Sequence, residues 1–66
     1  MLKTEIRTLR LAKGMDQAEL AALVGVRRET IGRLEKGQYN PSLKLAMDIA
    51  KVFDRTVEGV FSFQEE

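Results

Sequence analysis

The chain of 66 residues contains neither cysteine nor histidine. Disulfides, thiolate nucleophiles, imidazole bases and the common transition-metal ligands are therefore all missing. Its longest apolar run, Leu20–Val24, is too short to span a membrane, and no signal-peptide pattern opens the chain. We expect a cytoplasmic protein that holds neither a metal nor another cofactor.

The composition that remains, 44% apolar and 32% charged, suits a soluble globule. A chain of this length buries only about 60% of its unfolded surface, so its core is small. We expect one domain over residues 1–66, without room for separate substrate and cofactor domains. Carboxylates are plentiful, but no nucleophile–base pair and no glycine-rich phosphate loop accompany them, so the sequence does not indicate an enzyme.

The net charge of +1 hides an uneven distribution of charge along the chain. Residues 27–44 carry a net charge of +3, whereas residues 45–66 carry −3. A basic middle beside an acidic end is typical of a protein that turns one face toward a polyanion. An ordinary solvated surface is the alternative that the composition leaves open.

Three glycines (Gly14, Gly25 and Gly37) and the Asn40-Pro41 pair divide the chain into short pieces of helical period. The first piece ends at Gly14, and its apolar residues recur at spacings of three and four. These residues are Leu2, Ile6, Leu9 and Ala12.

The start of the second helix is predicted by Asp16, which stands three residues before Glu19 in the spacing of a capping box. This helix should end at Gly25 in the left-handed conformation. A third helix is predicted from Arg28 to about Lys36, with Ile31 and Leu34 turned inward.

Pro41 has a fixed φ that suits the start of a fourth helix. The apolar stripe of that helix consists of Leu43, Ala46, Ile49, Ala50 and Phe53. Thr56 is placed to cap a short fifth helix. The tail Phe61–Gln64 alternates apolar and polar residues, which is the period of a strand that could pair with Met1–Lys3. A frayed terminus is the alternative.

The most informative stretch is residues 17–36, where two short helices are separated by a turn that contains Gly25. Helices joined in this way cross at a steep angle, and their contact needs a small residue, a place that Ala21 fills. Gly25 allows the positive φ of the turn. The apolar residues that face a common core are Leu20, Val24, Val26, Ile31 and Leu34. The pattern predicts a helix-turn-helix.

The sequence resembles the Cro/C1-type (Xre-like) helix-turn-helix regulators along nearly its whole length, and most of all their short dimeric repressors. The matching stretches are Ile6-Arg7-x-Leu9-Arg10, Gln17–Ala21, Gly25-Val26, Thr30-Ile31, Glu35-x-Gly37, Asn40–Leu43, Ile49–Phe53 and Val57–Phe61. The resemblance implies an all-α, five-helix, lambda-repressor-like domain with a small antiparallel pair formed by Met1–Lys3 and Phe61–Gln64. It also implies a sequence-specific repressor of transcription that binds a palindromic operator in double-stranded DNA as a homodimer, with the 28–36 helix in the major groove.

Two positions depart from the family's pattern. Arg27 stands where a serine or threonine usually caps the recognition helix, so a cap that typically contributes about 1 kcal/mol is missing. Asp54 stands where a glycine is common after the fourth helix. Because aspartate tolerates the left-handed conformation better than most residues, we expect a similar turn.

The resemblance implies that Arg28, Glu29 and Arg33 contact bases. Arginine can form two hydrogen bonds to guanine, and glutamate can accept one from the amino group of cytosine. A pair between Glu29 and Arg33 within the helix is the alternative reading. The expected contacts to the DNA backbone are Gln17, Arg27, Thr30, Lys36, Gln38, Tyr39 and Asn40. For Tyr39, packing is the alternative.

Arg10 and Glu35 each follow a leucine expected to face inward. The resemblance implies that they form a partly buried ion pair between the first and third helices.

The end of the chain is expected to form the interface of the homodimer. Its apolar residues exceed what so small a core should absorb, and an exposed apolar patch marks an interface. These residues are Val57, Val60, Phe61 and Phe63. A protein-interaction module that serves as an antitoxin or a coactivator is the second reading of the same fold.

Overall fold

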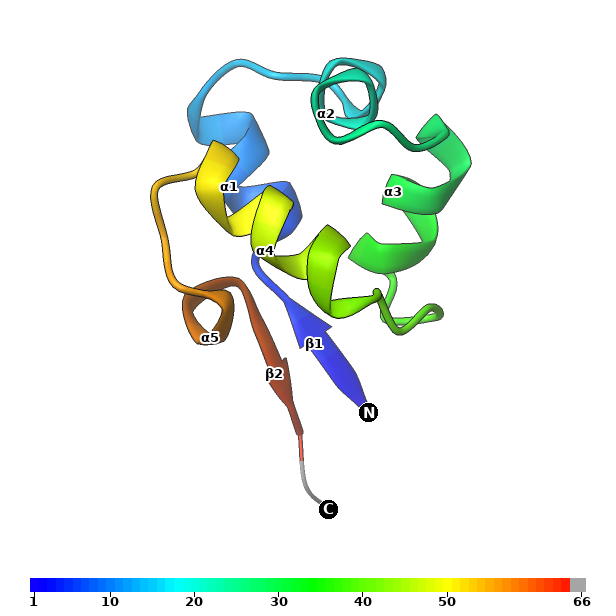
Figure 1. The fold of residues 1–66 in the computed structure, drawn as a ribbon, viewed down its shortest axis with the longest axis vertical. Helices are drawn as coiled ribbons and strands as arrows, with labels where there is room; N and C mark the ends of the chain where they lie inside the picture. The colour runs from blue at the N-terminus through cyan, green and yellow to red at the C-terminus, as the bar shows by residue number, and fades with distance from the viewer. Residues whose placement is uncertain (65–66) are drawn as a thin grey trace.

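The computed structural model describes residues 1–64, which form five helices and a two-stranded sheet (Figure 1). The elements are β1 (Leu2–Thr4), α1 (Ile6–Ala12), α2 (Gln17–Val24), α3 (Arg28–Glu35), α4 (Leu43–Val52), α5 (Val57–Val60) and β2 (Phe61–Phe63). Figure 1 shows the sheet and the N-terminus at one end of the molecule, with α3 on one side and the α4–α5 connection on the opposite side. The expected five-helix fold is confirmed.

Local signals in the sequence determine where the helices begin and end. The capping box of α2 is present: Asp16 Oδ1 accepts from the Glu19 N–H at 2.8 Å, and Glu19 Oε1 accepts from the Asp16 N–H at 3.2 Å. Thr56 Oγ1 caps α5 by accepting from the Gly59 N–H at 3.0 Å. Asp54 has a φ of 53°, so it takes the left-handed turn expected after α4.

The strands β1 and β2 pair in antiparallel orientation, which confirms the expected pair at the chain ends. Leu2 lies opposite Phe63, and Thr4 lies opposite Phe61. The Gln64 N–H donates to the Met1 carbonyl oxygen at 2.8 Å. The pairing therefore covers the whole segment Phe61–Gln64 that was predicted to form a strand.

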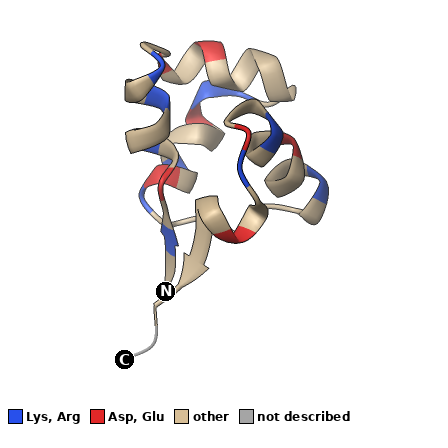
Figure 2. Cartoon of the chain, turned by 90° about the vertical axis from the view of Figure 1, so that its left-hand side faces the viewer, with Lys and Arg blue, Asp and Glu red and all other residues tan. Residues whose placement is uncertain are grey.

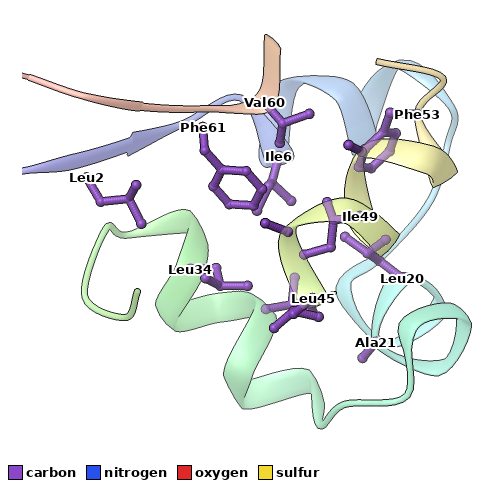
Figure 3. Close-up of a cluster of buried hydrophobic side chains, with 13 residues drawn as sticks. Leu2, Ile6, Leu20, Ala21, Leu34, Leu45, Ile49, Phe53, Val60 and Phe61 are labelled. Carbon is purple, nitrogen blue, oxygen red and sulfur yellow. The ribbon is translucent and has the colours of Figure 1, made fainter. Parts of the chain in front are cut away.

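The core lies between the helices and one face of the sheet (Figure 3). Its six fully buried side chains are Ile6, Leu20, Ile31, Leu34, Ile49 and Val60. Ala21, 3% exposed, belongs to the same core on α2 and leaves α3 room to cross closely.

Three details of the predicted helices were wrong. Leu2 belongs to β1 instead of the stripe of α1, because α1 begins only at Ile6. Ala12, at the end of that stripe, is the last residue of α1 and is exposed. In α4, Leu43 is 72% exposed and Leu45 takes the core position.

The start of α4 explains this last error. Ser42, not Pro41, sets the start of the helix, because Ser42 Oγ accepts from the Leu45 N–H at 3.1 Å. Leu43 is therefore the first residue of the first turn, on the side that faces away from the core.

Candidate nucleic-acid interface

The α2–turn–α3 unit holds α3 against the core by one side only. Gly25 has a φ of 73°, and the Val26 N–H donates to the Ala21 carbonyl oxygen at 3.0 Å, which closes the turn. Ile31 and Leu34 are fully buried, whereas Arg28, Glu29 and Arg33 are exposed. The helix therefore turns its charged side away from the protein.

A surface groove runs along this outward side of α3. We call it the α3 groove; it is lined by Gln17, Arg28, Glu29, Gly32, Arg33, Lys36 and Gln38. The structure thus brings together all three expected base-contacting residues and three of the expected backbone contacts. Three of the lining side chains are cationic and one is anionic, so the groove suits a polyanion.

A second hollow lies on the other flank of α3 and is lined by Arg27, Glu29, Thr30 and Arg33. Glu29 and Arg33 line both hollows, so they form the ridge between them. Within residues 1–64 these two side chains do not form the intrahelical ion pair that was the alternative reading. Arg27 gives α3 no side-chain cap, as its chemistry predicts, and its guanidinium is exposed.

Behind the groove, a buried network joins α1, α2 and α3. Arg10 Nε lies 2.8 Å from Glu35 Oε2, and both side chains are more than nine-tenths buried. Glu35 Oε1 accepts from Arg10 Nη2 at 3.2 Å and from Gln17 Nε2 at 3.0 Å. The hydrogen bond to Glu35 raises the pKa of Arg10 above its ordinary value, against the opposing effect of burial.

This network adds a structural role to the DNA-backbone contact expected of Gln17. Its side-chain amide is already donating to Glu35, so the amide acts first as a brace between α2 and α3. The amide nitrogen carries two N–H donors, so one donates to Glu35 while the second is left for a phosphate. A phosphate contact at this position can therefore draw on this second N–H and on the backbone N–H of Gln17, which begins α2.

Tyr39 does not line the α3 groove. It lines a different hollow, between the end of α2 and the start of α4, together with Val24, Gly25, Val26, Ser42, Lys44, Leu45 and Asp48. Tyr39 is 42% exposed there, so its expected contact to the DNA backbone stays a prediction. Asn40 is exposed in the α3–α4 connection.

The apolar end of the chain is mostly absorbed by the protein's own core, contrary to the sequence-based argument for a dimer interface. Val60 is 1% exposed and Phe61 is 9% exposed, and both pack in the core shown in Figure 3. Val57 is half-buried against the core. Only Phe63, at 70%, is strongly exposed. The argument failed because it counted Val60 and Phe61 as surplus, whereas β2 turns Phe61 inward.

An exposed apolar pair that the sequence argument missed lies on α4. Leu43 and Met47, 72% and 43% exposed, share a hollow with Lys44, Asp48 and Lys51. Their spacing of four residues is the signal that would have placed them together on one side of a helix.

The side of the molecule opposite α3 does not repeat the cationic pattern of the groove. Figure 2 looks at this side, where acidic and basic positions are mixed and β2 carries neither. Glu65 and Glu66, which contribute to the acidic end of the sequence, lie outside the described residues. Residues 1–64 contain no helix long and apolar enough to cross a membrane.

A steep two-helix unit whose second helix is buried on one side and cationic on the other defines a DNA-binding helix-turn-helix protein. The comparisons with known proteins agree with this class. The model of the Helix-turn-helix family matches residues 6–60, and the chain belongs to this family. It is 57% identical over 65 residues to an HTH-type transcriptional regulator of Archaeoglobus fulgidus that is itself uncharacterized, covering 98% of this chain and 93% of the relative.

Solved structures support the same fold. The restriction-modification controller protein C.AhdI from Aeromonas hydrophila is 39% identical, with a TM-score of 0.74 over 82% of each chain. The P22 c2 repressor, solved in complex with a synthetic operator, has a TM-score of 0.77 over 80% of each chain. At 24% identity, the second likeness concerns the fold alone. The relatives matched by sequence are named as HTH-type regulators of transcription.

Proposed function

We propose that this protein is a repressor that binds a palindromic operator as a homodimer, with α3 in the major groove. The observation that carries the proposal is the α3 groove, in which Arg28, Arg33 and Lys36 line the outward side of a helix whose other side is buried. A helix that enters the major groove needs both features, because one side must be held by the protein while the other meets the bases.

The geometry indicates which residues contact base edges and which contact phosphates. Glu29 and Arg33 form the ridge of α3 and are the residues that we assign to base edges, with Arg28 at the start of the helix. Lys36 and Gln38 continue the groove beyond α3 and suit phosphates on one strand. Arg27 and Thr30, on the other flank, suit the backbone there.

Two copies are needed because one recognition helix covers too few base pairs for tight discrimination among genomic sites. Two α3 helices about 34 Å apart would read successive major grooves on one side of the duplex. The exposed ring of Phe63 and the half-buried Val57 are the part of the expected interface that remains available. A dimer through this end would place the uncharged β2, rather than the cationic α3, at the contact.

We propose repression as the mode of action because a bound operator is closed to other proteins. The P22 c2 repressor, solved in complex with an operator, shows that this fold is compatible with repression. The controller protein C.AhdI shows that a chain of 39% identity serves in the control of a restriction-modification system. We place the activity in the cytoplasm and assign it no cofactor.

Selection of bound fragments from random or host DNA tests the proposal directly. A palindromic consensus is expected, with half-sites spaced by about one helical turn. On that operator, Arg28→Ala and Arg33→Ala should each cost roughly 1–3 kcal/mol and relax the preference at one position in each half-site. Lys36→Ala is the matched control, because it should weaken all sequences alike and flatten the salt dependence by about one unit.

The same experiment distinguishes the proposed repressor from the second reading of the fold, a protein-interaction module. A protein-directed module, such as an antitoxin or a coactivator without its own operator, would select no consensus. Unchanged selectivity in Arg28→Ala and Arg33→Ala would show that α3 is not the reading helix.

A further inference from the structure

A further hollow lies beside the α3 groove, toward α1, and three helices contribute to it. It is lined by Arg7 and Arg10 of α1, Asp16–Ala18 at the start of α2, and Arg28 of α3. We call it the arginine hollow. Gln17 and Arg28 line both this hollow and the α3 groove, so the two lie next to each other and share these side chains. A duplex that fills the groove therefore passes the mouth of the hollow.

The charges in the hollow do not cancel. Arg10 is neutralised by Glu35, and its Nη1 also donates to the Met15 carbonyl oxygen at 3.0 Å. Asp16 is held by the capping box with Glu19. In the part of the chain that the structure describes, neither Arg7 nor Arg28 forms an ion pair. Two exposed guanidinium groups therefore face the hollow against one carboxylate.

We propose that Arg7 is a DNA-binding residue that contacts a backbone phosphate at the outer edge of each half-site, beside Arg28. The inference rests on the DNA-binding function proposed above and extends the interface from α2 and α3 to α1. A guanidinium suits a phosphodiester because it presents several N–H donors in a plane. Ala18 is the only apolar residue in the lining, so the hollow suits a phosphate better than a base. The contact would fix the position of the protein on the DNA without reading its sequence.

The position of Arg7 in the fold supports this role. It lies three residues before Arg10 on α1, and the buried pair of Arg10 with Glu35 ties that helix to α3. Arg7 is thus carried by the same rigid unit that carries Arg28. The sequence analysis included Arg7 in the matching stretch Ile6-Arg7-x-Leu9-Arg10 but assigned it no contact. Its spacing of three from Arg10 is the signal that placed both on one side of α1.

The test compares Arg7→Ala with Arg55→Ala on a short duplex of arbitrary sequence, over a range of salt concentrations. Arg55 is an exposed arginine in the α4–α5 connection, opposite α3 in Figure 1, so the control removes the same charge far from the groove. For Arg7→Ala, the slope of log Kd against log salt should fall by about 0.9, the value of one phosphate contact. The loss of affinity relative to the wild type should then shrink about eightfold when the salt concentration is raised tenfold. Arg7→Lys should restore most of the slope.

Failure of this inference is distinguishable from failure of the proposed function. If the wild type binds duplex DNA with a steep slope and Arg7→Ala behaves like Arg55→Ala, Arg7 is not a contact residue. If the wild type shows no salt-dependent binding at all, the DNA-binding function itself is wrong. Titration with inorganic phosphate alone, followed by NMR of the arginine side chains, should show no saturation in the millimolar range. Saturation there would overturn the proposal in favour of a small-anion site.

Discussion

Leu2 and Phe63 lie directly opposite each other in the β1–β2 ladder, yet Leu2 is 7% exposed and Phe63 is 70% exposed. Residues opposite each other in a ladder point to the same face of the sheet. The face of the sheet that packs on the core at Leu2 is therefore exposed to solvent at Phe63. An aromatic ring left bare on a core-facing surface is the feature that favours a second copy at this end of the molecule.

The first prediction is that Phe63→Asp converts the protein to a monomer without unfolding it. The wild type should have about twice the mass of 7.5 kDa at micromolar concentration, and the variant about that mass. Light scattering measures the mass, and circular dichroism measures the helical content. Because only the dimer spans two half-sites, operator affinity should fall far more than non-specific affinity.

Phe61→Asp provides the contrast, since it changes the neighbouring aromatic residue of the same strand. Phe61 is buried, so its replacement should cost at least about 3–5 kcal/mol and unfold much of the protein. A wild-type protein that stays monomeric at high concentration, or a Phe63→Asp variant that stays dimeric, would contradict the assignment of this end. In the latter case, the exposed pair Leu43 and Met47 on α4 would be the next surface to vary.

The second prediction concerns the buried ion pair. Glu35→Ala leaves Arg10 without its carboxylate and Gln17 without its acceptor, so it should cost on the order of 3–5 kcal/mol. The pKa of Arg10 is raised, so this residue stays charged throughout the physiological range and its part of the pair is not lost there. Urea unfolding at pH 7 measures the change in the free energy of unfolding.

The exposed pair of Lys44 and Asp48 is the control for this prediction. Their side chains form an ion pair at 2.7 Å in α4, but the Lys44 side chain is 86% exposed. Asp48→Ala should therefore cost less than about 0.5 kcal/mol. Equal costs for Glu35→Ala and Asp48→Ala would mean that the burial of the first pair contributes nothing.

Elements whose determinants are local could be predicted from the sequence. The capping box of Asp16 and Glu19, the turn at Gly25 and the left-handed Asp54 each depend on a few adjacent residues. The pattern of outward charges on α3 followed from its period, and so did the grouping of Arg28, Glu29 and Arg33.

The errors arose at residues whose surroundings are determined by parts of the chain that are distant in sequence. Leu2 fits the stripe of α1 by spacing, but pairing with β2 removes it from that helix. Phe61 looked like surplus apolar surface until β2 turned it into the core. The hydrogen bond between Gln17 and Glu35 was not predicted, because the two residues are eighteen positions apart in the chain. Such contacts depend on tertiary packing, which cannot be predicted from the apolar periodicity of a single segment.

The third prediction uses the close contact between α3 and β1. Gly37 has a φ of +72°, and a β-carbon there would overlap the carbonyl oxygen of Leu2. Gly37→Ala should therefore combine backbone strain with a clash against β1, at a total cost of more than about 2 kcal/mol. Gly14→Ala is the matched control, because Gly14 has a φ of +64° with no atom within 4 Å of the added carbon. Thermal unfolding of both variants should show the larger loss for Gly37→Ala, and equal losses would rule out the clash.

The last prediction separates stability from DNA binding at Gly32. This glycine lies within α3 and lines the α3 groove, and the nearest atom to an added β-carbon is Gln17 Nε2 at 3.9 Å. The protein itself therefore has room for a methyl group at this position. Because glycine inside a helix costs about 0.5–1 kcal/mol relative to alanine, Gly32→Ala should raise the free energy of unfolding by that amount. If DNA approaches the backbone of α3 closely, the same methyl group should weaken operator binding. A variant that is more stable but binds less tightly would show that the glycine serves the DNA. A variant that is more stable and binds equally well would show that the backbone of α3 at Gly32 is not in close contact with the DNA.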